Sequence, residues 1–353
     1  MLNEGTNIVV DKSKRSKKRR VKVLIIRFSS IGDIVLTTPV IRCVKEQLPN
    51  ASVHFLSKKT FKAVTEANPY IDKFFYYSKD IFDLIQELRN ERYDYIIDLH
   101  KNMRSLKIRM GLNVKTFTYR KQNFNKFLLV NFHINFLSYR HISDRSLDAV
   151  APLGIVNDGK GLDYFIPKTV HISISDLPLT HQSGYIGIVI GASYHTKKLP
   201  QSKLIELCTY IDYPIVLIGG KEDMKVASEI AKENPEKIVN ACGKFGLNES
   251  AWLVQQSKLI ITHDTGLMHI AAAFDKTILS VWGNTIPNFG MNAYYGDRIS
   301  KDTQFQVENL SCRPCNKIGK HKCPKGHFKC MREQDVEQIG ITAMQFINSM
   351  NNE

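Results

Sequence analysis

A loop at residues 28–33, Phe-Ser-Ser-Ile-Gly-Asp, joins hydroxyls, a glycine and a carboxylate directly after an apolar run. Helical periodicity follows it, so Asp33 is predicted near a helix N-terminus, where the helix dipole favours the carboxylate and lowers its pKa. Gly32 would permit an unusual backbone angle and close approach of a ligand. The loop is either a carboxylate general base pointing into a cleft or a pair of ordinary helix caps at Ser30 and Asp33.

A second loop, Thr-His-Asp-Thr-Gly-Leu-Met-His at residues 262–269, precedes an isoleucine and three alanines. A helix that opens with Thr265 and Gly266 leaves backbone N–H groups free for a phosphate, beside the carboxylate of Asp264. His269 lies one turn further on the face of Thr265. It is either a packing residue or a ligand for a leaving group.

Basic and acidic residues follow two further apolar runs. The loop at residues 191–200 contains Ser193, Lys197 and Lys198, and its lysines either neutralise a diphosphate or form an exposed basic turn. Residues 219–223 end with Glu222 and Asp223, of which one is a candidate acceptor for ribose hydroxyls.

Four of the seven cysteines lie close together near the C-terminus, at Cys312, Cys315, Cys323 and Cys330. Four thiols in this span predict either a tetrahedral structural zinc site or a group of reduced thiols. Only the first pair has the close spacing of a zinc ribbon. Four thiolates would leave no open coordination position, so we expect no catalytic role for a metal here.

The elements that must position these loops alternate between strands and helices, as in doubly wound parallel sheets. Strands are predicted in a first series at 23–26, 53–56, 73–77, 93–99 and 114–119, and in a second series at 185–190, 214–218, 259–262 and 277–281. Helices are predicted at 33–48, 201–211, 222–233, 248–257 and 266–274. The loops therefore meet at the carboxyl ends of strands, in a cleft between two α/β domains.

We predict five segments along the chain. They are a basic flexible leader at 1–22, domains at 23–165 and 175–310, a Cys-rich segment at 311–333 and a C-terminal helix at 334–353. Glycines and prolines between residues 151 and 182 predict the connection between the domains.

Composition and charge exclude several classes of protein. The 353 residues are 43% hydrophobic and 24% charged, which is typical of a folded globular chain and not of a disordered or collagen-like one. No apolar run approaches the roughly 18 residues that a membrane-spanning helix needs, and no secretion signal is recognised, so we expect a cytoplasmic protein. Neither a dinucleotide fingerprint nor a P-loop occurs in the first loop, which disfavours dehydrogenases and ATPases.

The net charge of +15 is spread unevenly: residues 1–22 hold eight basic and two acidic residues, which give +6, and the remaining +9 lies in the rest of the chain. Such a leader either holds the protein on an anionic membrane surface, contacts nucleic acid nonspecifically or only improves solubility.

Residues 27–39, Arg-Phe-Ser-Ser-Ile-Gly-Asp-Ile-Val-Leu-Thr-Thr-Pro, and 264–272, Asp-Thr-Gly-Leu-Met-His-Ile-Ala-Ala, together resemble glycosyltransferase family 9. This family contains the heptosyltransferases that build the inner core of lipopolysaccharide. The resemblance covers roughly residues 21–345 and implies the GT-B fold, in which two Rossmann-like domains face each other across a cleft.

The resemblance also implies an inverting transfer of heptose from ADP-heptose to a lipopolysaccharide inner-core acceptor. Asp33 matches the family's catalytic base and Lys197 its phosphate-contacting lysine, although Lys198 is adjacent. Donor binding is implied for Asp264, Thr265, Gly266, His269 and Ser193, with Glu222 or Asp223 near the nucleoside. No cofactor is required for this chemistry.

On the acceptor side, Ser30, Gly32, Arg104 and Arg120, with Lys121, are candidates to hold a lipid A core. The expected partners are the nucleotide-sugar, this lipid acceptor and the inner-membrane surface, to which the enzyme would bind peripherally. Three alternatives remain: a family 9 enzyme with another nucleotide-sugar, a non-catalytic sensor of sugar nucleotides, and a basic-tailed nucleic-acid-binding protein with a four-cysteine zinc module.

Overall fold

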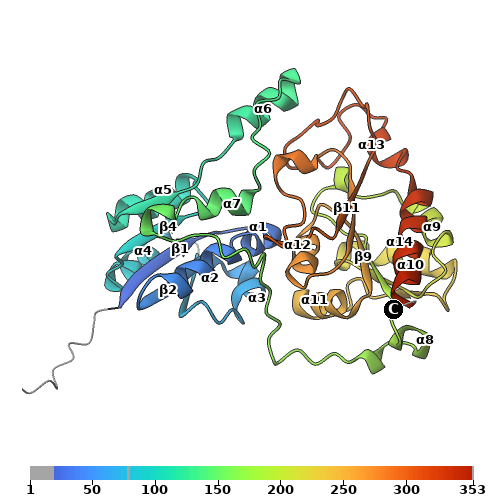
Figure 1. The fold of residues 1–353 in the computed structure, drawn as a ribbon, viewed down its shortest axis with the longest axis horizontal. Coiled ribbons are helices and arrows are strands. Elements are labelled where there is room, and N and C mark those ends of the chain that lie inside the picture. Colours follow the sequence, from blue (N-terminus) through green and yellow to red (C-terminus); the bar gives the residue numbers. More distant parts are fainter. Residues whose placement is uncertain (1–19, 78–79, 352–353) are drawn as a thin grey trace, which may run out of the picture.

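The structure is a computed structural model that describes residues 20–77 and 80–351. The basic leader predicted at 1–22 therefore lies almost wholly outside the described residues. Two parallel sheets lie side by side, each with helices on both faces (Figure 1). None of the helices in the described ranges is long and apolar enough to cross a membrane.

The N-terminal sheet has five parallel strands in the order β3-β2-β1-β4-β5. The strands are β1 (Val21–Ile26), β2 (Ala51–Lys58), β3 (Lys73–Tyr77), β4 (Tyr95–Asp98) and β5 (Thr116–Thr118). The chain moves outward from β1 through β2 to β3 and then crosses to β4 on the other side of β1. This reversal opens a crevice at the carboxyl end of β1, where the first predicted loop begins.

Both faces of this sheet are buried, and successive side chains of β1 point alternately to one face and the other. Val23 and Ile25 belong to a hydrophobic cluster that includes residues of α2 (Thr38–Gln47) and α7 (Ile142–Leu147). Leu24 and Ile26 belong to a separate cluster that includes residues of α4 (Ile81–Asn90) and α5 (Met103–Leu112). A fully buried parallel strand reads as a continuous apolar run for this reason.

The single helix predicted at 33–48 is wrong, because two helices occupy this stretch. They are α1 (Ile31–Val35) and α2, separated by Leu36 and Thr37. Pro39 has no N–H to donate to the carbonyl of Val35, so a continuous helix would lose that hydrogen bond and crowd the ring against the preceding turn. At the second position of α2 the same proline is tolerated.

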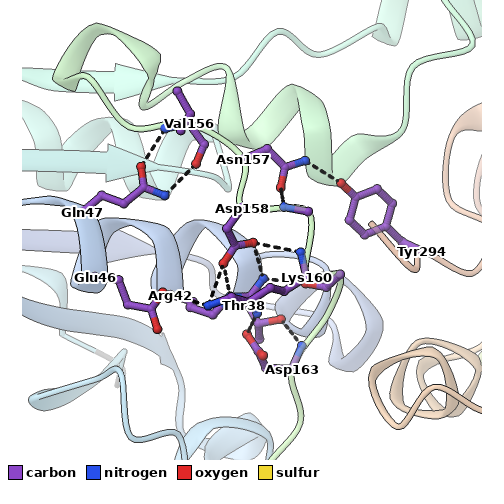
Figure 2. Close-up of polar contacts among 12 residues, drawn as sticks. Thr38, Arg42, Glu46, Gln47, Val156, Asn157, Asp158, Lys160, Asp163 and Tyr294 are labelled. Carbon is purple, nitrogen blue, oxygen red and sulfur yellow. Dashed lines mark hydrogen bonds and ion pairs between the residues drawn. The ribbon is translucent and has the colours of Figure 1, made fainter. Parts of the chain in front are cut away.

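The connection between the domains begins with residues 154–164, which a buried arginine anchors to α2 (Figure 2). The side chain of Arg42 is 1% exposed. It donates to both carboxylate oxygens of Asp158 at 2.7 and 2.9 Å, to the carbonyl of Gly161 at 2.9 Å, and to Asp163. These carboxylates hold the pKa of Arg42 above its usual value, although burial opposes this.

The C-terminal sheet has six parallel strands in the order β11-β10-β9-β6-β7-β8. The strands are β6 (Ile186–Val189), β7 (Ile215–Ile218), β8 (Ile238–Asn240), β9 (Leu259–His263), β10 (Ile278–Trp282) and β11 (Asp302–Gln306). The order reverses between β6 and β9, so a second crevice opens at their carboxyl ends. Two edge strands, β8 and β11, were not predicted, because one has three residues and the other is mostly polar.

The helices of this half agree with the sequence periodicity. They are α9 (Gln201–Thr209), α10 (Met224–Lys232), α11 (Leu247–Gln256), α12 (Gly266–Ala273) and α14 (Val336–Asn351), with short α3 (Lys62–Thr65), α8 (Leu179–Gln182) and α13 (Lys329–Arg332) elsewhere in the chain. The C-terminal α14 buries Val336, Ile339, Ala343 and Ile347 in the cluster beneath α9.

The two domains share one hydrophobic cluster, which contains residues of both sheets. Helices α1 and α12 contact each other at the centre of the molecule (Figure 1). The predicted architecture, two doubly wound α/β domains, is therefore confirmed.

Candidate functional site

A pocket of about 490 Å³ lies between the domains, at the carboxyl ends of β1, β5, β6, β9 and β10. The N-terminal domain contributes the loop after β1 and the segment that leads into α6 (Asn123–Phe132). The lining residues are Arg27, Ser30, Gly32, Asp33, Tyr119, Lys121, Asn123, Lys126, Ile142, Ser193, Tyr194, Lys197, Asp264, Thr265, Gly266, His269, Trp282, Thr285, Ile286, Phe289, Met291, Lys317 and Ile318. The structure thus brings the first two predicted loops together with Lys197.

Asp33 is held from two sides at the first turn of α1. One carboxylate oxygen accepts the backbone N–H and the hydroxyl of Ser30 at 3.0 and 2.7 Å, and the other pairs with Arg27 at 2.5 Å. Burial opposes ionisation, yet Arg27 and the bonds from Ser30 keep the pKa of Asp33 below its ordinary value. Asp33 is therefore both a helix cap and an ionised carboxylate on the pocket wall.

Lys197 and Asp264 form an ion pair on the opposite wall. The Lys197 ammonium donates to the Asp264 carboxylate at 2.5 Å and to its backbone carbonyl at 3.3 Å. Thr285, which the sequence reasoning missed, donates its hydroxyl to the same carboxylate at 3.0 Å. Each side chain follows a different strand, so the pair forms only when β6, β9 and β10 are adjacent.

The helix α12 begins beside this pair. Thr265 is its N-cap and accepts the N–H of Met268 at 3.4 Å, and Thr265 and Gly266 both line the pocket, so the N-terminus of α12 lies at the pocket wall. Burial lowers the pKa of His269 to about 4, which makes the ring neutral at pH 7. Its Nδ1 is buried and has no hydrogen-bond partner in the described part of the chain.

Gly32 and Gly266 allow the two domains to touch. A Cβ at Gly32 would lie 2.6 Å from Cδ2 of His269, and one at Gly266 would lie 2.7 Å from Ile31. Gly32 sits inside α1 with helical backbone, so the unusual backbone angle predicted for it is wrong. Close approach of the other domain is the physical reason for a glycine here.

Lys126 is the main pocket residue that the sequence reasoning missed. It projects from α6, and its ammonium lies 4.8 Å from the centre of the Phe289 ring. Burial, with a smaller effect of Arg145, lowers the pKa of Lys126 to about 8. Burial and Arg27 also lower the pKa of Lys121. Lys121 was a sequence candidate for the acceptor side, whereas only the basic composition around α6 hinted at Lys126.

Several predicted residues do not line the pocket. Lys198 pairs with the buried carboxylate of Asp223 at 2.6 Å, and Asp223 also accepts the N–H of Gly220 at 3.0 Å. Glu222 is exposed beside it. The pair therefore braces the loop after β7, and Lys197, not Lys198, faces the cleft.

Some of the residues predicted to bind the acceptor line the pocket and others do not. Arg104 is exposed near Tyr77, with its guanidinium 5.9 Å from the ring centre, and Arg120 is exposed as well. Neither lines the pocket, whereas Ser30, Gly32 and Lys121 do.

The Cys-rich segment forms part of the pocket wall through Lys317 and Ile318. The carbonyl of Lys320 accepts the N–H of Thr196 at 3.1 Å, and the N–H of Lys320 donates to the Thr196 hydroxyl at 2.8 Å. Within residues 20–77 and 80–351, no three His, Cys, Asp or Glu side chains are grouped so as to hold a metal ion. Burial raises the pKa of the Cys330 thiol to about 12, so this sulfur is protonated here. Zinc binding by the four thiols stays a prediction.

Comparison with known proteins agrees with this architecture. The model of glycosyltransferase family 9 (heptosyltransferase) matches residues 81–324. Lipopolysaccharide heptosyltransferase 1 of Campylobacter coli is 24% identical over 292 residues, which are 75% of this chain and 84% of that protein. Lipopolysaccharide heptosyltransferase 3 of Escherichia coli K12 is 27% identical over 284 residues, 72% of this chain and 80% of that protein.

Two solved structures share the fold. A family 9 glycosyl transferase from Veillonella parvula has a TM-score of 0.71 at 21% identity, covering 93% of this chain and 98% of that one. The E. coli ADP-heptose lipopolysaccharide heptosyltransferase II has a TM-score of 0.68 at 18% identity, and the match covers 94% of this chain and 100% of that one. The fold is GT-B, as the resemblance implied. With its family model matched over most of the chain, this protein belongs to glycosyltransferase family 9 and is a glycosyltransferase.

Proposed function

We propose that the protein transfers heptose from ADP-heptose to an inner-core lipopolysaccharide acceptor, with inversion at the anomeric carbon. One observation carries the proposal: a carboxylate from one domain, Asp33, and a cationic, amide-rich wall from the other domain line the same pocket. Its relatives named as heptosyltransferases support the choice of sugar. The proposal also places the enzyme peripherally on the inner-membrane surface, where its lipid acceptor is held.

In this mechanism Asp33 accepts the proton of the acceptor hydroxyl as its oxygen bonds to the anomeric carbon. The bond from that carbon to the diphosphate breaks on the opposite face, so no covalent enzyme intermediate forms. The low pKa of Asp33 ensures that the carboxylate is ionised near neutral pH. Because it is then a weak base, proton transfer comes late, when bond formation has made the hydroxyl acidic.

The leaving ADP develops negative charge against the opposite wall. Lys197 and the first-turn N–H groups of α12 are placed to stabilise it. Asp264, which also accepts the hydroxyl of Thr285, keeps the Lys197 ammonium in position. Lys126 and Lys317 add positive charge to the same pocket.

The test is Asp33→Asn, assayed for heptose transfer to a water-soluble inner-core acceptor. We expect turnover to fall by about 10²- to 10⁴-fold while ADP binding, measured by calorimetry, is retained. Turnover near that of the wild type would reject Asp33 as the base. Selective binding of UDP or GDP instead of ADP would reject heptose from ADP-heptose as the donor and retain a glycosyltransferase of the same family.

A further inference from the structure

Residues 121–140 form a hairpin, here called the α6 hairpin, that stands apart from both sheets (Figure 1). It consists of α6 and a returning segment. The side chain of Asn125 donates to the carbonyl of Phe136 at 2.7 Å, and Gln122 donates to the carbonyl of Ser138 at 3.3 Å. These bonds join the two arms, so the hairpin presents a defined surface.

The inner side of the α6 hairpin packs on the C-terminal domain. Leu129 and Leu137 are buried in a small cluster with Phe289, and Lys126 lies over the same ring. The outer side is different, because six large apolar side chains are exposed by 45–70% of their surface. They are Phe124, Phe127, Phe132, Ile134, Phe136 and Tyr139. Soluble surfaces rarely gather so many large apolar side chains without a partner.

The stretch of sequence that contains the α6 hairpin is basic, although Arg140 pairs with Asp148 at 2.8 Å and Arg109 with Asp98 at 3.4 Å. Residues 99–143 contain no aspartate or glutamate, and they contain nine lysines and arginines: Lys101, Arg104, Lys107, Arg109, Lys115, Arg120, Lys121, Lys126 and Arg140. Two further exposed apolar side chains, Met103 and Met110, lie on α5 beside Arg104 and Lys107. The exposed apolar side of the α6 hairpin, flanked by basic residues, is complementary to a surface that is anionic outside and apolar inside.

We propose that the α6 hairpin docks the enzyme on an anionic lipid bilayer, with its aromatic side chains inserted at the headgroup boundary. Aromatic rings favour this interface, and each basic residue near an anionic surface strengthens binding by about fivefold. A second copy of the chain is a poorer occupant, because like charges would face each other. A protein partner is disfavoured by the lysines, which protein interfaces generally exclude.

Docking through this hairpin would bring the catalytic pocket to the lipid surface. Asn123, Lys121 and Lys126 belong to the hairpin and also line the pocket. A lipid-anchored acceptor would then reach Asp33 without leaving the bilayer. This part of the inference rests on the proposed function, whereas the binding itself does not.

The experiment is flotation of the full chain with vesicles of phosphatidylcholine alone or with about 30% phosphatidylglycerol. The variant Phe124→Ser/Phe127→Ser/Phe136→Ser is compared with wild type and with Leu179→Ser/Ile299→Ser, which removes two side chains that are 84% and 88% exposed elsewhere. All three keep residues 1–22, so any contribution of the leader is constant. We expect the triple variant to lose at least about tenfold in partitioning to anionic vesicles and the control variant to match wild type.

A second measurement separates insertion from adhesion by charge alone. Fluorescence of Phe127→Trp should shift to the blue on anionic vesicles and be quenched by brominated lipid. Equal partitioning of wild type and triple variant, equal binding to neutral vesicles, or absence of quenching would overturn the proposal. The proposal would also be overturned if the wild type self-associates and the triple variant is monomeric.

Turnover with a water-soluble acceptor distinguishes this proposal from the proposed function. The triple variant should keep wild-type turnover in solution, because none of its three residues lines the pocket. Vesicle binding without any heptose transfer would reject the activity and leave the docking surface supported.

Discussion

Lys126 predicts how donor affinity depends on pH. Its pKa of about 8 reflects burial, which outweighs the opposing effect of the Asp264 and Asp33 carboxylates. A bound diphosphate would raise this pKa. The affinity for the donor should therefore be highest well below pH 8, where Lys126 is protonated in both states, and should decline as the pH rises through 8 toward the pKa of the complex. With a pKa of about 8, about nine-tenths of Lys126 is protonated at pH 7 and about one-tenth at pH 9, so affinity should fall by about tenfold.

The assay is calorimetric titration with an ADP-sugar between pH 7 and 9. Its diphosphate is esterified at both ends, so the ligand itself does not titrate in this range. Lys126→Arg should bind with little dependence on pH, because a guanidinium stays protonated, and Lys126→Gln should bind weakly throughout. A flat wild-type profile, or an equal slope in Lys126→Arg, would refute the assignment of this titration to Lys126.

Three further predictions concern stability, domain contact and metal content. Arg42→Leu should destabilise the fold by about 3 kcal/mol in urea unfolding, because it strands two largely buried carboxylates; a loss within the 1 kcal/mol typical of exposed pairs such as Arg140 and Asp148 would argue against a structural anchor. Gly32→Ala should cost about 1–3 kcal/mol and raise the donor KM, because its Cβ meets His269, whereas Gly246→Ala, which meets only the flexible end of Glu249, should change neither. Elemental analysis of the freshly purified chain should find about one zinc per molecule if the four clustered thiols coordinate it; a content well below one would remove that prediction.

Much of the fold was predictable because short apolar runs and helical periods report burial directly. Strands β1, β6, β7, β9 and β10 are all rich in buried apolar residues, which is characteristic of strands covered on both faces. Strand β11 escaped because its residues are mostly polar and none of them is fully buried, so its sequence carries no such pattern.

The candidate site was predictable where its residues are neighbours in sequence. Asp33 with Ser30, and Asp264 with Thr265 and Gly266, lie in loops whose placement follows from the strand before them and the helix after them. The choice between Lys197 and Lys198 was different, because adjacent residues in a turn point in different directions. Only the packed loops show that Lys197 meets Asp264 while Lys198 meets Asp223.

By itself, the sequence determined the doubly wound α/β class, the two site loops and their likeness to family 9, since each depends on local pattern and residue type. Tertiary structure alone decided that Lys126 and Thr285 join the pocket, that Gly32 is needed for contact with His269, and that the aromatic side of the α6 hairpin is left uncovered. The physical reason is that burial, close approach and charge pairing arise between segments distant in the chain. Their partners are set by how the two domains pack.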